Sequence, residues 1–309
     1  MDVRRLGGSA LSTPRLVLGG NVFGWTASGA EAFAILDRFA EAGGTMIDTA
    51  DVYSAWVPGH KGGESERLLG DWLKRSGRKD IAIATKVGFM AGLKAEGIAK
   101  AAEASLARLG VEAIDLYYAH KDDEATPLEE TLAAFDALVR AGKVRAIGAS
   151  NYTAERLAQA LAVSEREGLA RYEVLQPEYN LMTRTGYEGA LQQLCVAQGI
   201  GVLPYFGLAA GFLTGKYRRE EDFAKSIRGT RMADYLNERG LEVLAALDEV
   251  AAESGATPAQ VALAWLAAQP GVTAPIASAT SLAQLEELLG VLTLELSPGQ
   301  LKRLSAGSP

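Results

Sequence analysis

Four polar residues stand at or just after the ends of short apolar stretches: Asp48, Tyr53, Lys86 and His120. A tyrosine hydroxyl has an ordinary pKa of about 10, and a neighbouring ammonium favours its ionised form. Tyr53 could then give a proton to a carbonyl oxygen or take one from an alcohol. Lys86 would tune the tyrosine, Asp48 would hold Lys86, and His120 would donate a hydrogen bond to the substrate oxygen. The four residue types together predict acid–base catalysis, provided that they meet in space.

Each of these residues also has a simpler interpretation. An Asp or Lys at a strand end is more often a loop cap or a surface ion pair, His120 could satisfy a backbone carbonyl, and Tyr53 could pack a loop. A barrel lysine such as Lys86 could instead form a Schiff base in a lyase, but it would then be desolvated without a paired carboxylate and tyrosine. The joint placement on consecutive strands favours the acid–base interpretation.

Eight short apolar stretches, each followed by a longer segment of helical periodicity, would position these residues. Their starts lie roughly 30 residues apart, which is typical of βαβ units. The expected strands are 16–18, 45–49, 81–87, 113–120, 144–150, 173–176, 200–206 and 272–279. The expected helices are 31–42, 66–75, 98–109, 128–140, 154–167, 189–197, 258–268 and 282–289. Thr126-Pro127 and Thr257-Pro258 predict helix starts with a threonine N-cap.

This alternation closes most economically as an α/β fold of the (β/α)8 TIM-barrel type. We expect an N-terminal β-hairpin formed by 3–6 and 10–13 around Gly7-Gly8, and extra helices near the C-terminus at 235–253 and 298–304. A doubly wound sheet would require Gly-x-Gly-x-x-Gly after the first strand, which the sequence GGNVFG at 19–24 does not match. With no linker in the sequence, residues 1–309 are predicted to form a single domain. In such a barrel Asp48, Lys86 and His120 would end adjacent strands at the same face.

Composition narrows the class of protein. The chain has 309 residues, of which 48% are hydrophobic, and a formal net charge of −7. This charge argues against a nucleic-acid or anionic-membrane partner. The single cysteine, Cys195, cannot form an internal disulfide, and neither a membrane-length apolar run nor a signal peptide is recognised. We therefore expect a cytoplasmic protein with a small-molecule partner and no metal site; the oligomeric state is not predicted.

Several motifs resemble those of the aldo-keto reductases. They are IDTADVYS at 47–54 with GESERLLG at 63–70, ATKV at 84–87, DLYYAH at 115–120, GKVRAIGASNY at 142–152 and QPEYN at 176–180. The likeness runs in unbroken order from about Arg5 to Leu289, and five motifs fall on predicted strand ends.

The resemblance implies a barrel that binds NADP(H), or less often NAD(H), without a Rossmann fold. It implies hydride transfer to an aldehyde or ketone, or from the alcohol, with Tyr53 as the proton donor. The nicotinamide carboxamide would bind Ser150, Asn151 and Gln176, and its ring would stack on Tyr205. The loop 211–217 resembles the family's pyrophosphate loop. The further cofactor contacts that the resemblance implies are Gly20, Asn21, Leu208, Gly211, Leu213, Gly215, Lys216, Arg231, Ser278, Thr280, Gln284 and Glu287.

Three departures from the family pattern bear on the cofactor. Phe206-Gly207-Leu208 stands where Ser-Pro-Leu is common, Thr280 stands where a Lys or Arg often binds the 2′-phosphate, and Leu288 replaces an Asn. The choice between NADP(H) and NAD(H) therefore stays open. A basic loop could bind the phosphates or simply be solvated; its members are Lys216, Arg218, Arg219, Arg228 and Arg231.

The substrate contacts expected are Trp25 and Trp56, in loops after the first and second strands. Such aromatics form either a pocket wall or a lid over the core. The short tail after the last helix suggests an open pocket that tolerates many substrates. Because the potassium-channel β subunits share this barrel, a cofactor-sensing partner protein is the alternative function, although no docking surface is recognised.

Overall fold

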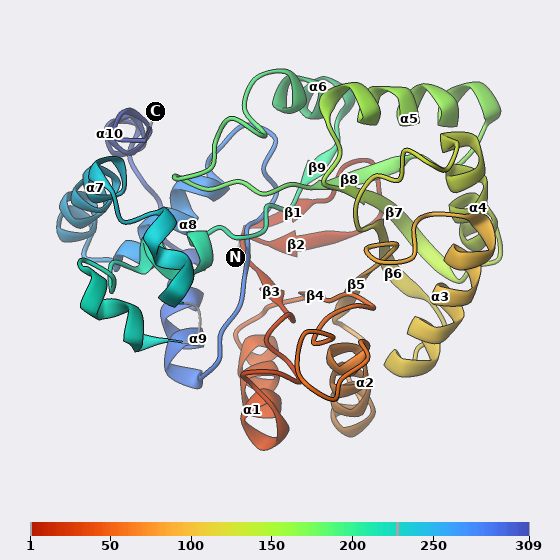
Figure 1. The fold of residues 1–309 in the computed structure, drawn as a ribbon, viewed down its shortest axis with the longest axis horizontal. Coiled ribbons are helices and arrows are strands. Elements are labelled where there is room, and N and C mark those ends of the chain that lie inside the picture. Colours follow the sequence, from red (N-terminus) through yellow and green to blue (C-terminus); the bar gives the residue numbers. More distant parts are fainter. Residues whose placement is uncertain (1, 227–228, 309) are drawn as a thin grey trace.

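Eight parallel strands form one sheet in the order β10-β3-β4-β5-β6-β7-β8-β9 in a computed structural model that describes residues 2–226 and 229–308. Hydrogen bonds between the two outermost strand regions close the sheet: Thr273 N donates to Val202 O at 2.8 Å, and Ile276 N donates to Pro204 O at 2.9 Å. Helices surround the strands (Figure 1). The predicted (β/α)8 barrel is confirmed.

The elements follow the predicted succession closely. The barrel strands are β3 (Val17–Gly19), β4 (Met46–Asp48), β5 (Ala82–Val87), β6 (Ile114–Ala119), β7 (Val144–Ser150), β8 (Tyr172–Gln176), β9 (Gly201–Val202) and β10 (Ile276–Ala277). The helices are α1 (Gly29–Glu41), α2 (Glu64–Ser76), α3 (Ala95–Leu109), α4 (Leu128–Arg140), α5 (Ala154–Glu167), α6 (Ala190–Gln198), α7 (Glu238–Ser254), α8 (Pro258–Ala267), α9 (Leu282–Leu289) and α10 (Pro298–Ala306). Short 3-10 helices are η1 (Ala209–Thr214), η2 (Glu220–Lys225), η3 (Gly229–Asp234) and η4 (Gly290–Leu292).

The last two strands are much shorter than the predicted 200–206 and 272–279. Pro204 and Pro275 lie inside those two stretches, and a proline has no N–H to continue a ladder. The chain there remains extended and still supplies carbonyl acceptors, since Val17 N donates to Pro275 O at 3.0 Å. The apolar pattern therefore predicts the burial of these two segments correctly, but the strands themselves are shorter than it predicts.

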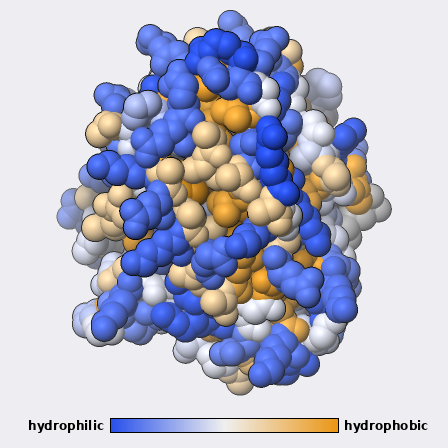
Figure 2. All heavy atoms as spheres, turned by 90° about the vertical axis from the view of Figure 1, so that its right-hand side faces the viewer, coloured by the Kyte–Doolittle hydropathy of each residue, from blue (hydrophilic) through white to orange (hydrophobic). Residues whose placement is uncertain are grey.

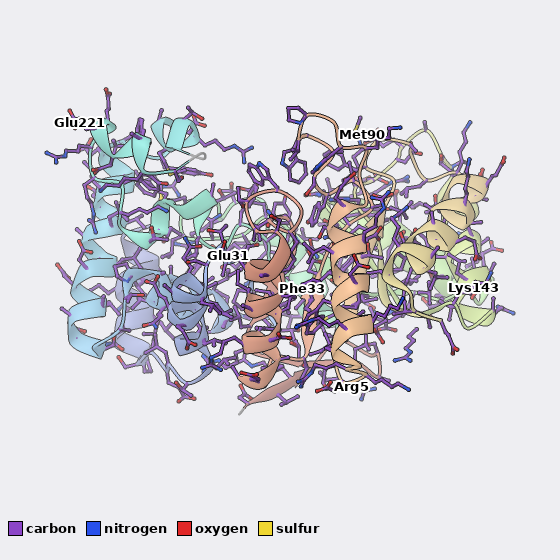
Figure 3. The ribbon with its side chains drawn as sticks, turned by 90° about the horizontal axis from the view of Figure 1, so that it is seen from below. Arg5, Glu31, Phe33, Met90, Lys143 and Glu221 are labelled. Atoms are coloured by element: carbon purple, nitrogen blue, oxygen red, sulfur yellow. The ribbon has the colours of Figure 1, made fainter. Side chains whose placement is uncertain are left out.

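The N-terminal hairpin is confirmed, with β1 (Val3–Arg5) antiparallel to β2 (Ser12–Pro14). Leu6, at its turn, is fully buried and joins the cluster inside the barrel with Val17, Met46 and Leu116. The hairpin thus plugs the bottom of the barrel. Figure 3 shows Arg5 at the opposite end of the molecule from Met90 and Glu221, which lie at the mouth.

Two predicted helix starts have different outcomes. Thr257 caps α8 as expected, accepting a hydrogen bond from Gln260 N. The prediction for α4 was wrong, because Pro127 itself occupies the N-cap position without a side-chain bond. The Thr126 hydroxyl instead donates to Asp123 Oδ2 at 2.7 Å.

Helices such as α1, α2, α4 and α5 are amphipathic, with buried apolar residues on one face and charged residues on the other, whereas α8 is buried along most of its length. On the side of the barrel seen in Figure 2, hydrophilic side chains surround scattered hydrophobic ones. Within residues 2–226 and 229–308, none of the helices combines the length and the apolar character that crossing a membrane requires.

Candidate active site

A cavity of about 1090 Å³ opens at the C-terminal ends of the strands. Asp48, Tyr53 and His120 line one end of it, and Thr280 and Glu287 line the other. Loops that follow parallel barrel strands meet at this face, which is where barrel enzymes build their sites. The cavity therefore joins the four predicted acid–base residues to the segment around α9.

Lys86 lies at the centre of the four and has no exposed surface. Its Nζ donates to Asp48 Oδ2 at 2.7 Å, to Thr49 O at 2.7 Å and to Tyr53 Oη at 3.0 Å. An ammonium has only three protons to donate, so these contacts use all of them. Burial by itself lowers the pKa of Lys86, but the charge of Asp48 and the bonds to Asp48 and Tyr53 outweigh it, and the pKa is raised. A charged, fully engaged lysine is poorly suited to Schiff-base chemistry.

Tyr53 is held by Lys86 but not ionised by it. Burial raises the pKa of the Tyr53 hydroxyl above its ordinary value, and this effect exceeds the opposing charge of Lys86. The net direction is opposite to the one expected from the sequence. Because Oη accepts the bond from Lys86, the hydroxyl keeps its own proton for another acceptor, and Tyr53 lines the cavity. Tyr53 is thus suited to act as an acid.

His120 follows β6 and its ring lies close to Tyr53, with 6.0 Å between the ring centroids. Burial lowers the pKa of His120 to about 2, with the charges of Lys86 and Lys121 acting in the same direction. The imidazole is therefore neutral. Among the described residues its buried Nδ1 has no hydrogen-bond partner. A neutral imidazole can offer an N–H to an oxygen in the cavity.

The three residues expected at the carboxamide are brought together beside this group. Gln176 Nε2 donates to Asp48 Oδ1 at 2.8 Å, and Ser150 Oγ donates to Gln176 O at 2.8 Å. Asn151 Nδ2 donates to His120 O at 2.9 Å, and Asn151 is in the left-handed region at φ 58°. A short polar side chain tolerates that backbone conformation better than most. Hydrogen bonds thus connect the three residues expected at the carboxamide with Asp48 and His120.

Tyr205, the expected stacking residue, also lines the cavity. Its hydroxyl donates to Asn151 Oδ1 at 2.8 Å, which links the aromatic wall to the amide positions. Sequence reasoning did not foresee this bond, since residue type alone does not say where a phenol points.

The other expected cofactor residues divide into two groups. Gly20, Leu213 and Gly215 do not line the cavity. Leu213 is fully buried, and Gly20 N donates to Asp48 O at 2.7 Å. The residues that do line it are Asn21, Leu208, Gly211, Lys216, Arg231, Ser278, Thr280, Gln284 and Glu287.

The basic loop is only partly directed at the cavity. Arg218 pairs with Asp248 at 2.7 Å, and Arg219 lies 3.7 Å from Glu221. Lys216 and Arg231 line the cavity instead. Arg228 lies outside the described residues. Two of the five basic residues are therefore placed to meet an anion in the cavity, and two are occupied by carboxylates.

The far end of the cavity holds no cation among the residues expected there. Thr280 donates to Gln284 Oε1 from both its backbone N, at 2.9 Å, and its hydroxyl, at 3.1 Å. Ser278 Oγ donates to Asn21 Oδ1 at 2.7 Å. This end can bind neutral polar groups, and Glu287 adds a carboxylate to it.

A long cavity with amide groups near Tyr53 and two cations farther along suits a nicotinamide dinucleotide. Gly211 also lines the cavity, at φ 105°, a conformation open to glycine, and an added Cβ there would meet no atom closer than 3.9 Å. Ser150, Asn151 and Gln176 would hold the amide, and Lys216 and Arg231 would meet the phosphates. The residues present thus fit the cofactor that the motifs imply.

Aromatic rings surround the part of the cavity beside Tyr53 and His120, where the sequence predicts substrate contacts. Trp56 lies 6.1 Å from Tyr53 and 5.6 Å from Trp25, each distance between ring centroids in an edge-to-face arrangement. Phe89, which sequence reasoning missed, lies 4.9 Å from the His120 ring and lines the cavity. Its position three residues after Lys86, in the loop after β5, was the available signal. Trp56 and Phe89 are 49% and 42% exposed, so both offer apolar surface to a ligand.

Comparisons with known proteins identify the family of the chain. The model of the family described as Aldo/keto reductase family matches residues 15–307. The chain is 31% identical to the aldo-keto reductase yakc of Schizosaccharomyces pombe, which carries NADP(+) in its name, over 88% of this chain and 80% of that one. It is 33% identical to the uncharacterized oxidoreductase YrpG of Bacillus subtilis, over 99% and 95% of the two chains. It is 32% identical to a probable voltage-gated potassium channel subunit beta of Arabidopsis thaliana, over 93% and 90%.

Proposed function

Because the chain belongs to the aldo/keto reductase family, we propose that it transfers a hydride between NADP(H), or less often NAD(H), and an aldehyde or ketone or the corresponding alcohol. Tyr53 is the general acid in reduction and the base in the reverse direction. The observation that carries this proposal is the bond from Lys86 to Tyr53 at 3.0 Å beside the open cavity. A relative named as an oxidoreductase supports the reaction class.

A nicotinamide held by Ser150, Asn151 and Gln176 would supply the hydride for the carbonyl carbon. Tyr53 gives its proton to the carbonyl oxygen, so that the product is a neutral alcohol. The ammonium of Lys86 stabilises the tyrosinate that this transfer leaves, and Asp48 keeps Lys86 charged. His120 donates a hydrogen bond to the same carbonyl oxygen and orients it.

Cofactor choice is the finer part of the proposal. The relative with NADP(+) in its name supports NADP(H), as do Lys216 and Arg231 in the cavity. Thr280 weakens the case, because its hydroxyl is bonded to Gln284 where a cation would meet the 2′-phosphate. We therefore place NADP(H) first and NAD(H) second.

Residues 1–309 are proposed to act as one cytoplasmic domain with small-molecule partners only. The formal net charge of −7 and the single cysteine support this, since the chain is acidic overall and has no second cysteine for an internal disulfide.

The test is a fluorescence titration with NADPH and with NADH, followed by turnover of a panel of aldehydes and ketones. We expect both nucleotides to bind, NADPH more tightly, and at least one carbonyl to be reduced. If neither nucleotide binds, the reductase proposal fails.

Binding without turnover of any carbonyl would instead favour a cofactor-sensing partner protein. The similarity to a protein named as a potassium channel subunit beta is the observation that favours this second function. Its identity to this chain is comparable with that of the named reductase, so the turnover measurement decides between them.

A further inference from the structure

Behind the acid–base residues, on the outer side of β5, lies a second buried ionisable cluster. Glu66, at the start of α2, has no exposed surface. One carboxylate oxygen accepts a bond from the Thr85 hydroxyl at 2.6 Å, and the other accepts one from Arg108 Nε at 2.6 Å. Thr85 precedes Lys86 in β5, so this cluster lies back to back with the catalytic one.

Asp51 connects the two clusters through the backbone. Tyr53 N donates to Ala50 O at 3.2 Å, which closes a tight turn with Asp51 at its second position. Asp51 N donates to the Lys86 carbonyl at 3.2 Å. Asp48 and Tyr53, on either side of Asp51, line the cavity, whereas Asp51 does not.

The charges of Glu66 and Arg108 in the outer cluster act on the Asp51 carboxyl group. Its Oδ1 is buried, and within the described residues it has no hydrogen-bond partner. The ionisable groups that face it come from four elements: Glu66 of α2, Arg108 of α3, Lys86 of β5 and Tyr117 of β6. The Tyr117 hydroxyl is likewise buried without a partner in the described part of the chain.

The charge of Arg108 acts on both carboxyl groups, but its guanidinium donates directly to Glu66, at 2.6 Å, and to the Ser105 hydroxyl, at 3.1 Å. Burial and the charge of Glu66 raise the pKa of Asp51 to about 6, against the opposing charge of Arg108. A protonated Asp51 can donate a hydrogen bond to a neighbouring acceptor, whereas an ionised Asp51 is repelled by Glu66. A backbone hydrogen bond from Val52 favours the ionised form, but burial and the repulsion by Glu66 outweigh it, so the turn accommodates the protonated form better.

We propose that Asp51 is a positioning residue: with Glu66 and Arg108 it fixes, from behind, the turn that places the Tyr53 hydroxyl on Lys86. The role presumes the proposed carbonyl reduction, in which a small displacement of Tyr53 slows proton transfer. As the pH rises and Asp51 ionises, the turn loosens and Tyr53 is held less well.

The first test compares Asp51→Asn, which imitates the protonated side chain, with the wild-type protein in reduction of one small aldehyde. From about pH 5 to about pH 8 we expect kcat/KM of the wild type to fall by roughly tenfold through about pH 6. The fall should lie in kcat, with the cofactor Kd unchanged. Asp51→Asn should keep the high value throughout. Glu66→Gln should shift the fall to lower pH, because it removes the repelling charge that raises the pKa of Asp51.

Asp71→Asn is the matched control, since Asp71 is an exposed carboxylate on α2. It should retain the wild-type profile. A wild-type profile without this fall, or the same fall in Asp51→Asn, would overturn the proposal.

A second measurement does not depend on turnover. Fluorotyrosine is incorporated, and the fluorine resonance of Tyr53 is identified as the one absent from Tyr53→Phe. We expect this resonance to move through about pH 6 in the wild type and to stay fixed in Asp51→Asn. If it moves in both, Asp51 does not position Tyr53. If it behaves as expected but no carbonyl is reduced, the proposed function fails while the positioning by Asp51 stands.

Discussion

Lys86 Nζ lies 3.0 Å from the Tyr53 hydroxyl oxygen and 4.7 Å from the centroid of the Tyr53 ring. The ammonium thus both donates to the oxygen and lies against the face of the ring. This contact fixes the direction of the phenol. In the proposed reaction, it would also place a positive charge where negative charge develops when the proton leaves, which would lower the barrier to proton transfer.

Removing the Tyr53 hydroxyl should abolish most turnover and leave the cofactor site intact. We expect Tyr53→Phe to lower kcat by roughly 10²–10⁴-fold, the usual contribution of a positioned acid. The NADPH Kd should change by less than about twofold, because the hydroxyl is expected to contact the substrate. Tyr152→Phe, which removes a hydroxyl bonded to Tyr172 at 3.4 Å, is the control. Turnover of Tyr53→Phe at the wild-type rate would remove Tyr53 from the mechanism.

Removing only one partner of the buried pair of Asp48 and Lys86 should lower the free energy of unfolding more than replacing both partners. Lys86→Met leaves the Asp48 charge buried without its partner and should lower the free energy of unfolding by about 3–5 kcal/mol. Adding Asp48→Asn removes that charge and should restore much of the loss. Denaturant unfolding of the single and double variants checks this, and equal stabilities would contradict it.

Phe89 should select for substrates with an aromatic group. We expect Phe89→Ala to raise the KM of an aromatic aldehyde by roughly tenfold through loss of ring contacts, with kcat little changed. A small aliphatic aldehyde should keep its KM within about twofold. Val196→Ala removes another exposed apolar side chain, on α6, and serves as the control. Similar KM shifts for both aldehydes would mean that Phe89 acts on the shape of the site rather than on the substrate.

Lys216 and Arg231 should bind cofactor phosphates. Because bonds between charged partners are strong, we expect either Ala variant to weaken NADPH binding by roughly tenfold or more, with less effect at high salt. Arg218→Ala should have little effect, since Arg218 is paired with Asp248 at 2.7 Å. Titrations at two ionic strengths would measure the changes. A loss of affinity equal in all three variants would point to general loop charge instead.

Asp51 should make stability depend on pH in a particular direction. Its pKa is raised from 3.8 to about 6 by folding, so the folded chain holds this proton more tightly than the unfolded chain. The contribution of Asp51 to stability is therefore greatest below about pH 4, falls as the pH rises to about 6, and is constant above. Asp51→Asn should remove this slope and gain on the order of 3 kcal/mol at neutral pH. The free energy of unfolding of the wild type and of Asp51→Asn, measured at two pH values, checks this, with Asp71→Asn as the control. If its dependence on pH is the same in Asp51→Asn as in the wild type, the burial of Asp51 is contradicted.

Much of the site could be read from strand ends. Asp48 is the last residue of β4, Lys86 is the next-to-last residue of β5, and His120 directly follows β6. All three lie close to the predicted strand ends. Parallel strands of one barrel bring such ends to one face, so their convergence followed from the period alone. Strand lengths near Pro204 and Pro275 were misjudged, because a proline's missing N–H breaks the ladder without changing the apolar pattern.

Other features of the site could not be predicted from the sequence. Phe89 was missed because an aromatic residue in a loop packs inward as often as it lines a cavity. The direction of the Tyr53 pKa was misjudged because it depends on the balance between burial and the charge of Lys86, and burial prevails. The division of the basic loop, with Arg218 paired and Lys216 in the cavity, depends on where α7 brings Asp248.

The sequence by itself determined the barrel and the order of its elements, and it singled out the four residues proposed for acid–base chemistry, since hydrophobic periodicity and residue type are local properties. Only the tertiary structure decided how those residues are charged, which loops wall the cavity, and that Asp51 faces a second buried cluster behind Tyr53. These depend on desolvation and on distances between residues far apart in the chain. Both arise only when the helices pack around the closed sheet.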